Sequence, residues 1–311
     1  MKILNAQYLA AALGALALAG AAAAQPMGAG APEIISHRTN PHDLGTPTAG
    51  SIGQITPVIT YHNGPVMATP SVYIIWYGNW NQTNGSDTSA GQQIVSDFLF
   101  GLNNSPYFNI NTSYGTPTGS ILVAAQTNDA YSQGTRLSDA KVQAVVASAL
   151  SSHRLVTDSN GVYLVLTSSD VAEQSGFCTK YCGWHTAGTI SSTNIKYAFI
   201  GNASRCLNAC SAQTVSPNGN PGVDAMISVV AHELEEATTD PNPTSGWADA
   251  NRSENADKCA WTFGQGLLRD SNGAFYNMTL KTATGTFRNF LVQRNLDVNS
   301  KCYVDYIGKT Q

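Results

Sequence analysis

The sequence predicts a single α/β domain in which helices pack against a mixed β-sheet and disulfides stabilise the fold. Two observations support this prediction. Short apolar runs, rich in β-branched and aromatic residues, alternate with segments of helical periodicity, which is typical of α/β proteins. All six cysteines follow an apolar leader, and an even number of cysteines in a secreted chain favours disulfides.

The leader occupies residues 1–24. Lys2 precedes the apolar run "YLAAALGALALAGAAAA", which ends in small residues, so a secretory signal peptide cut after Ala24 is predicted. The run is shorter than the roughly 20 residues that a membrane-spanning helix needs. The mature chain is therefore expected to be secreted or extracellular, with the periplasm or cell wall as alternatives, and to leave the membrane after cleavage.

Residues 25–66 are rich in Gly, Pro, Thr and Ala and show no strand or helix period, so they are predicted to form a flexible lead-in. The α/β domain is predicted over residues 67–311. Apolar runs predict its strands at residues 71–80, 120–127, 161–168 and 195–202, with short strands inside 274–280 and 287–294. Apolar stripes predict helices at 90–104 and 137–152, the second capped by Ser138.

A further helix is predicted from Asn220, a good N-cap, to Asp240, which precedes a proline. At about 100° per residue, its apolar residues form one broad stripe. His232, Glu233, Glu236 and Asp240 fall on an adjoining sector, whereas Glu235 points elsewhere. The helix therefore presents one acidic face beside its core face.

This acidic face resembles the zinc-protease motif H-E-x-x-H, with Glu236 in place of the second histidine. His232 and Glu236 are predicted metal ligands, and Glu233 is the predicted catalytic base that activates a bound water. Glu254 is the preferred third ligand. The alternatives for that ligand are Asp240, Asp249, Asp257 and His185. Zinc is the expected ion, and the carboxylates make calcium the alternative.

The cysteines are Cys178, Cys182, Cys206, Cys210, Cys259 and Cys302. Two tight C-x-x-x-C loops favour the pairs Cys178–Cys182 and Cys206–Cys210, which leaves Cys259–Cys302 as the third. Zinc binding by the two C-x-x-x-C units is the alternative.

The formal net charge is −4, and the chain has no basic cluster, so neither nucleic acid nor an anionic membrane is an expected partner. An extracellular peptide or a cell-wall substrate fits better. The oligomeric state does not follow from the sequence.

Several motifs resemble, in order, the EXORDIUM-like (phosphate-induced protein 1) family, from Val72 to Cys302. They are "VYIIWYGNW", "VYLVLTSSDV", "FCTKYCGWH", "KYAFIGNASRCLNAC", "GVDAMISVVAHELEEATTDP" and "ENADKC". The resemblance implies secretion to the cell wall or apoplast and a link to growth, with no settled biochemical activity. Plant members have a small residue and an asparagine at the positions of Glu236 and Asp240, so this chain resembles a microbial branch.

Two functions are weighed from these patterns. The first is a secreted metal-dependent hydrolase, a zincin-like peptidase whose substrate would lie along the edge-like strand at 195–202. The second is a non-catalytic extracellular or cell-wall protein that binds glycan or a partner, with the acidic cluster structural or calcium-binding.

Overall fold

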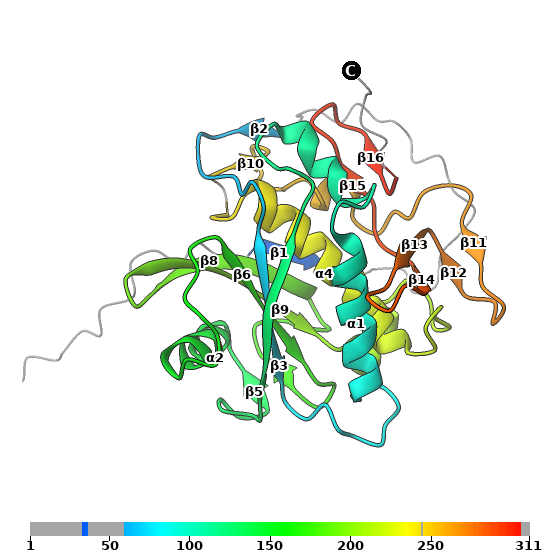
Figure 1. Cartoon of the computed structure of the whole chain (residues 1–311), viewed down its shortest axis with the longest axis horizontal. Helices are drawn as coiled ribbons and strands as arrows, with labels where there is room; N and C mark the ends of the chain where they lie inside the picture. Colours follow the sequence, from blue (N-terminus) through cyan, green and yellow to red (C-terminus); the bar gives the residue numbers. More distant parts are fainter. Residues whose placement is uncertain (1–32, 37–58, 244, 306–311) are drawn as a thin grey trace, which may run out of the picture.

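A computed structural model describes residues 33–36, 59–243 and 245–305 (Figure 1). The predicted signal peptide and most of the predicted lead-in lie outside the described residues. Two short strands fall within the lead-in range: β1 (Glu33–Ser36) and β2 (Thr60–Tyr61). Among the described residues, no helix combines the length and apolar character needed to cross a membrane.

A mixed six-stranded sheet forms the centre of the fold, as the sequence predicts. Its order is β1-β8-β9-β6-β3-β4. Strands β9, β6, β3 and β4 run parallel to one another, whereas β8 is antiparallel to β9 and β1 is antiparallel to β8. Their bounds are β3 Ser71–Tyr77, β4 Leu122–Asp129, β6 Gly161–Thr167, β8 Tyr181–Ile190 and β9 Thr193–Gly201.

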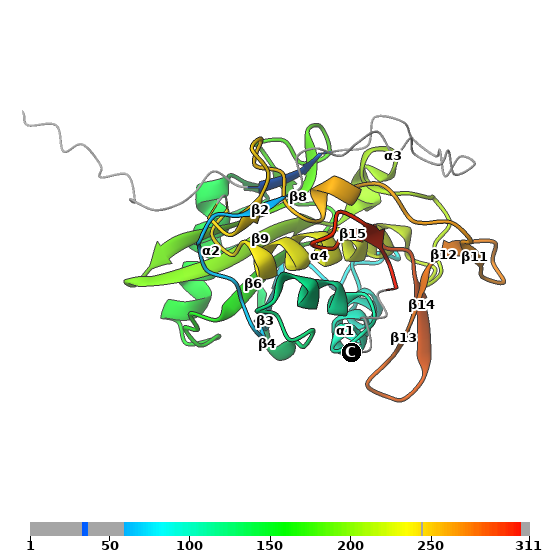
Figure 2. The same cartoon turned by 90° about the horizontal axis from the view of Figure 1, so that it is seen from above.

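Helices cover both faces of this sheet (Figures 1 and 2). Helix α4 (Pro221–Thr239) lies on one face with α1 (Ser89–Leu102) beside it, and α2 (Asp139–Ser151) lies on the other face. Strand β8 contacts a helix on each face, because successive side chains along a strand point to opposite faces of the sheet. A Cβ on Gly183 would meet Val229 of α4, and one on Gly188 would meet Gln143 of α2.

Local signals in the sequence explain where the helices begin. The Asn220 side chain accepts a hydrogen bond from the Val223 amide at 3.3 Å, and Pro221 takes the first helical position of α4. Thr88 caps α1 in the same way. Ser138 precedes α2 as predicted, but its side chain makes no capping hydrogen bond.

Short elements complete the described structure. The strands are β5 Arg136–Leu137, β7 Ala172–Glu173, β10 Trp247–Ala248, β11 Leu268–Arg269, β12 Phe275–Tyr276, β13 Met278–Lys281, β14 Phe287–Phe290, β15 Asn295–Leu296 and β16 Cys302–Tyr303. The helical turns are α3 Leu207–Cys210 and 3₁₀ segments at Phe108–Tyr114, Ala203–Arg205 and Asp257–Cys259.

The edge-like strand of the sequence prediction is not an edge. Strand β9, which covers residues 195–201 of that range, lies between β8 and β6. The strand beyond it, β8, was not predicted, because its sequence "YCGWHTAGTI" mixes glycine, cysteine and threonine without a clear period. Strand β8 in turn pairs with β1, in the register Glu33 to His185.

The disulfide prediction is correct for one pair and wrong for two. Cys259 pairs with Cys302 as expected, but Cys178 pairs with Cys206 and Cys182 with Cys210, at Cα–Cα distances of 5.7 and 5.4 Å. The start of β8 packs against α3, so each C-x-x-x-C unit faces the other and its cysteines pair across the contact. Such a contact between distant segments is invisible in local spacing.

Candidate metal centre

The acidic face of α4 is completely buried. His232, Glu233 and Glu236 each have 0% exposure, and His185, on the facing strand β8, has 1%. His185 points toward α4 because it lies two residues from Gly183, on the same face of β8. Ionisable groups are rarely buried this deeply unless they are paired or bind a metal.

Two groups of ligand-type atoms meet at this place. In the first, His185 Nδ1 lies 3.2 Å from Glu233 Oε2 and 3.5 Å from Glu236 Oε2. In the second, His232 Nε2 lies 2.9 Å from Glu236 Oε1 and 3.5 Å from Asp257 Oδ1. Glu236 belongs to both groups, so the residue that replaces the motif's second histidine is at the centre of the cluster.

The other predicted ligands have different surroundings. Glu254, the preferred third ligand, faces the second nitrogen of His185, with Oε2 at 3.6 Å from Nε2. The Asp240 carboxylate accepts a hydrogen bond from the Gly246 amide at 2.7 Å, and its carbonyl oxygen lies 3.4 Å from the same histidine nitrogen. Asp249 forms an ion pair with Lys258 instead. Of the downstream carboxylates, Asp257 therefore comes closest to His232.

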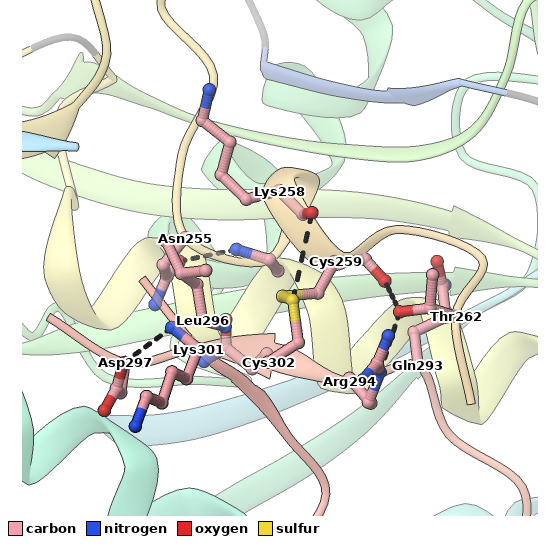
Figure 3. Close-up of a disulfide and its surroundings, with 12 residues drawn as sticks. Asn255, Lys258, Cys259, Thr262, Gln293, Arg294, Leu296, Asp297, Lys301 and Cys302 are labelled. Atoms are coloured by element: carbon pink, nitrogen blue, oxygen red, sulfur yellow. Dashed lines mark hydrogen bonds between the residues drawn. A yellow bond between two sulfur atoms is a disulfide. The ribbon is translucent and has the colours of Figure 1, made fainter. Parts of the chain in front are cut away.

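The Cys259–Cys302 disulfide anchors the segment that carries Asp257. Figure 3 shows this disulfide with its surroundings, including Thr262, whose hydroxyl donates to the Cys259 carbonyl and accepts from Arg294. The Asp257 amide also donates to Glu236 Oε1 at 3.0 Å. These bonds fix Asp257 against the end of α4, although it lies 21 positions from Glu236 in the sequence.

The electrostatics of the centre are those of buried charges held close together. Burial opposes protonation of both imidazoles, but Glu254 beside His185 and Glu236 beside His232 outweigh it and raise the pKa of each histidine well above its usual value. Burial also raises the pKa of Glu233 to about 7. In the metal-free state the cluster therefore retains protons that a cation would displace.

Some buried polar atoms of the centre have no hydrogen-bond partner within the part of the chain that the structure describes. They are His232 Nδ1 and Glu233 Oε1. Such buried atoms are rare in native proteins and call for an explanation such as a bound ion. Zinc accepts imidazole and carboxylate ligands together, so the residues present fit a divalent metal ion.

Glu235 points away from the centre, as the helix geometry predicts. Its Oε2 accepts a hydrogen bond from Asn295 Nδ2 at 2.5 Å, and its side chain is also fully buried. Burial raises its pKa well above the usual value. Glu235 and Glu236 thus share burial and sequence position but face different partners.

Comparisons with known proteins identify the family to which the chain is similar. A family model described as "Phosphate-induced protein 1 conserved region" matches residues 59–303. Protein EXORDIUM-like 5 of Arabidopsis thaliana is 31% identical over 280 residues, which cover 76% of this chain and 74% of the relative. Protein EXORDIUM-like 3 of the same plant is 30% identical over 279 residues, or 76% of this chain and 79% of the relative.

A third relative is Protein PHOSPHATE-INDUCED 1 of Nicotiana tabacum, 26% identical over 269 residues that cover 71% of this chain and 80% of the relative. These relatives are plant proteins, so the microbial branch stays a prediction. No solved structure matches the chain.

Proposed function

The chain belongs to the EXORDIUM-like (phosphate-induced protein 1) family, and from that premise we propose that it is an extracellular metalloprotein with a buried divalent-metal centre. His232, Glu236 and Asp257 bind the ion. The extracellular setting is supported by the three disulfides, which persist in oxidising compartments.

One observation carries the proposal: the meeting of His232, Glu236 and Asp257, whose ligand atoms all lie within 4.8 Å of one another. Each comes from a place that the fold must hold. His232 and Glu236 are one turn apart on α4, and Asp257 is held by the neighbouring disulfide. Three protein ligands from rigid elements are the minimum that a zinc site needs.

The donor set favours a zinc-type ion over calcium. Calcium takes six to eight oxygen ligands, whereas both ligand groups here include an imidazole nitrogen. Imidazole suits zinc and its first-row neighbours, and the carboxylates admit manganese. We therefore expect zinc or manganese, with calcium disfavoured.

Burial favours a structural role for the ion. A catalytic zinc keeps one position open to water and substrate. In this centre His232 and Glu236 have fully buried side chains, and Asp257 has a side chain that is 16% exposed. An ion there would join α4 to the 249–259 segment and stabilise both.

A zincin-like peptidase is the second candidate. Glu233 follows His232 on the motif helix and lies 3.2 Å from His185 Nδ1, and its carboxylate is the candidate general base. The antiparallel strand β8 beside the helix offers a path for an extended substrate once β1 leaves it. Cleavage of casein or a peptide library that is abolished by Glu233→Gln would favour this candidate.

Elemental analysis of the purified mature protein tests the metal proposal. We expect at least one zinc or manganese ion per chain, lost in Glu236→Gln. The matched control is Glu235→Gln, which changes the neighbouring buried glutamate and should keep the ion. Calcium alone, or a protein without metal after zinc loading and desalting, would overturn the proposal.

A further inference from the structure

We infer that the centre binds two metal ions bridged by the carboxylate of Glu236. This inference rests on the proposed metal centre and extends it. His232, Asp257 and Glu236 Oε1 hold the first ion, whereas His185, Glu233 and Glu236 Oε2 hold the second. The ligand class is a pair of divalent first-row cations such as zinc or manganese.

The two oxygens of Glu236 face different histidines. Oε1 lies 2.9 Å from His232 Nε2, and Oε2 lies 3.5 Å from His185 Nδ1. A carboxylate in this position binds one ion with each oxygen. Two-metal sites place their ions about 3.5–4 Å apart, a separation that a bridging carboxylate supports.

One nitrogen of each histidine faces two carboxylate oxygens at once. His185 Nδ1 faces Glu233 and Glu236, and His232 Nε2 faces Glu236 and Asp257. An imidazole nitrogen carries a single proton, so one N–H satisfies two converging oxygens poorly. A metal ion in front of the nitrogen contacts all three atoms.

The spacing within each group matches a coordination shell. The nitrogen-to-oxygen separations are 2.9 and 3.5 Å around His232, and 3.2 and 3.5 Å around His185, and all ligand atoms of each group lie within 4.8 Å of one another. Tetrahedral zinc with bonds of about 2.0–2.1 Å has ligand atoms about 3.3 Å apart. Both groups are therefore arranged much as a bound ion would require.

The far side of His185 is also arranged as in a metal site. A metal-ligating histidine donates its other ring N–H to a carboxylate or carbonyl, which fixes its tautomer. His185 Nε2 faces Glu254 Oε2 at 3.6 Å and the Asp240 carbonyl at 3.4 Å. Glu254 thereby becomes a positioning residue for His185, rather than the third ligand that its sequence position suggested.

The two-ion arrangement has a chemical consequence. Glu233 is a ligand of the second ion, so it is not free to activate water as the base of a single-zinc peptidase would be. In the two-ion centre Glu233 therefore has a different role from the one that the H-E-x-x-E motif predicts for a single-zinc peptidase.

Metal stoichiometry tests this inference directly. The purified mature protein is stripped with chelator, loaded with excess Mn²⁺ or Zn²⁺, desalted and analysed for metal per chain. We expect two ions per chain and an exchange-coupled electron paramagnetic resonance signal from the manganese form. His185→Asn should retain one ion and lose the coupling, and so should His232→Asn. Glu235→Gln should retain both ions.

The outcomes separate the two proposals. One ion per wild-type chain overturns the bridged pair and leaves the metal centre standing. Two ions without magnetic coupling also overturn the bridge, because Glu236 would not join them. No ion in the wild-type chain overturns both proposals. These readouts use the wild-type protein, so they hold even if a variant fails to fold.

Discussion

At the scale of single residues, the adjacent glutamates Glu235 and Glu236 point in different directions from the helix and therefore have different roles. Both side chains have 0% exposure, but Glu235 is hydrogen-bonded to Asn295 while Glu236 lies between two histidines and beside Glu233. In the metal-free protein Glu236 stabilises the protonated imidazoles beside it, and a bound cation would take over that role.

This contrast predicts that Glu236→Gln is destabilising and abolishes the response to zinc. Even in chelator the variant should be less stable than the wild type, because the buried His232 imidazole loses the carboxylate 2.9 Å away that stabilises its protonated form. With zinc at about 100 times its dissociation constant, the wild type should gain about 2.7 kcal/mol that the variant lacks. Thermal unfolding with and without zinc measures both effects. Glu235→Gln should respond to zinc like the wild type, and a zinc response retained in Glu236→Gln would contradict the prediction.

Position 183 must be a glycine because α4 packs too closely against β8 to leave room for a larger side chain. An added Cβ would lie 2.5 Å from Val229 Cγ1, so Gly183→Ala must push β8 away from α4. We expect a loss of about 1–3 kcal/mol in the free energy of unfolding, which urea denaturation measures.

Gly188→Ala is the matched control for that change. It lies on the same strand, and its Cβ would come close only to the end of the flexible Gln143 side chain, at 2.7 Å, with Tyr197 Cε1 at an ordinary contact distance of 3.4 Å. Its cost should be clearly smaller. Equal losses in the two variants would show that close packing of β8 on α4 is not the cause.

At the scale of elements, the Cys259–Cys302 disulfide joins the 249–259 segment to β16 across a sequence separation of 43. Removing it as Cys259→Ser with Cys302→Ser should cost up to about 4 kcal/mol through the entropy of the unfolded chain. Since Asp257 lies two residues from Cys259, the variant should also bind metal more weakly. Denaturation and metal content measure these two effects.

The Cys178–Cys206 disulfide is the comparison for this variant. Its sequence separation is 28, so its removal should cost nearly as much stability. Neither cysteine lies within six residues of a proposed ligand in the sequence, so the metal content should change little. Equal metal loss in both double variants would mean that general destabilisation, and not the position of Asp257, controls binding.

Strand β1 is an element whose effect can be isolated. It pairs with β8 beside His185, and an edge strand left without its partner exposes unpaired amide groups. A mature chain that lacks residues 25–36 should therefore exchange the amide protons of Gly183–His185 faster, as mass spectrometry of deuterium uptake measures. The amides of β6, inside the sheet, serve as the control. Unchanged uptake at β8 would show that β1 does not protect this edge.

At the scale of the whole molecule, the sheet determines how the protein responds to alkaline pH. Burial raises the pKa of Tyr73, Tyr77 and Tyr197 to about 12 each. A pKa raised in the folded state stabilises the protein fully below the unfolded value of about 10 and loses that effect as the pH rises toward 12.

The protein should therefore lose stability between about pH 10 and 12 and release tyrosine protons as it unfolds. Circular dichroism and tyrosinate absorbance, recorded together against pH, test this. Tyr197→Phe should make the decline shallower. Titration of these tyrosines near pH 10 in a chain that stays folded would contradict the prediction.

The sequence by itself determined the mixed α/β class, the helix from Pro221 to Thr239 and the shared face of His232, Glu233 and Glu236. These features depend on local causes. Helix periodicity, an Asn-Pro start and runs of β-branched residues act over a few neighbouring residues, so they can be read from one segment at a time.

Only the tertiary structure decided which distant residues meet. It exchanged the partners of the first four cysteines, placed the unpredicted strand β8 next to α4, and brought His185 and Asp257 to opposite oxygens of Glu236. These outcomes depend on contacts between segments far apart in the sequence, which form only when the sheet and the helices pack together. Local spacing carries no record of such contacts, so the bridging position of Glu236 becomes visible only in the folded chain.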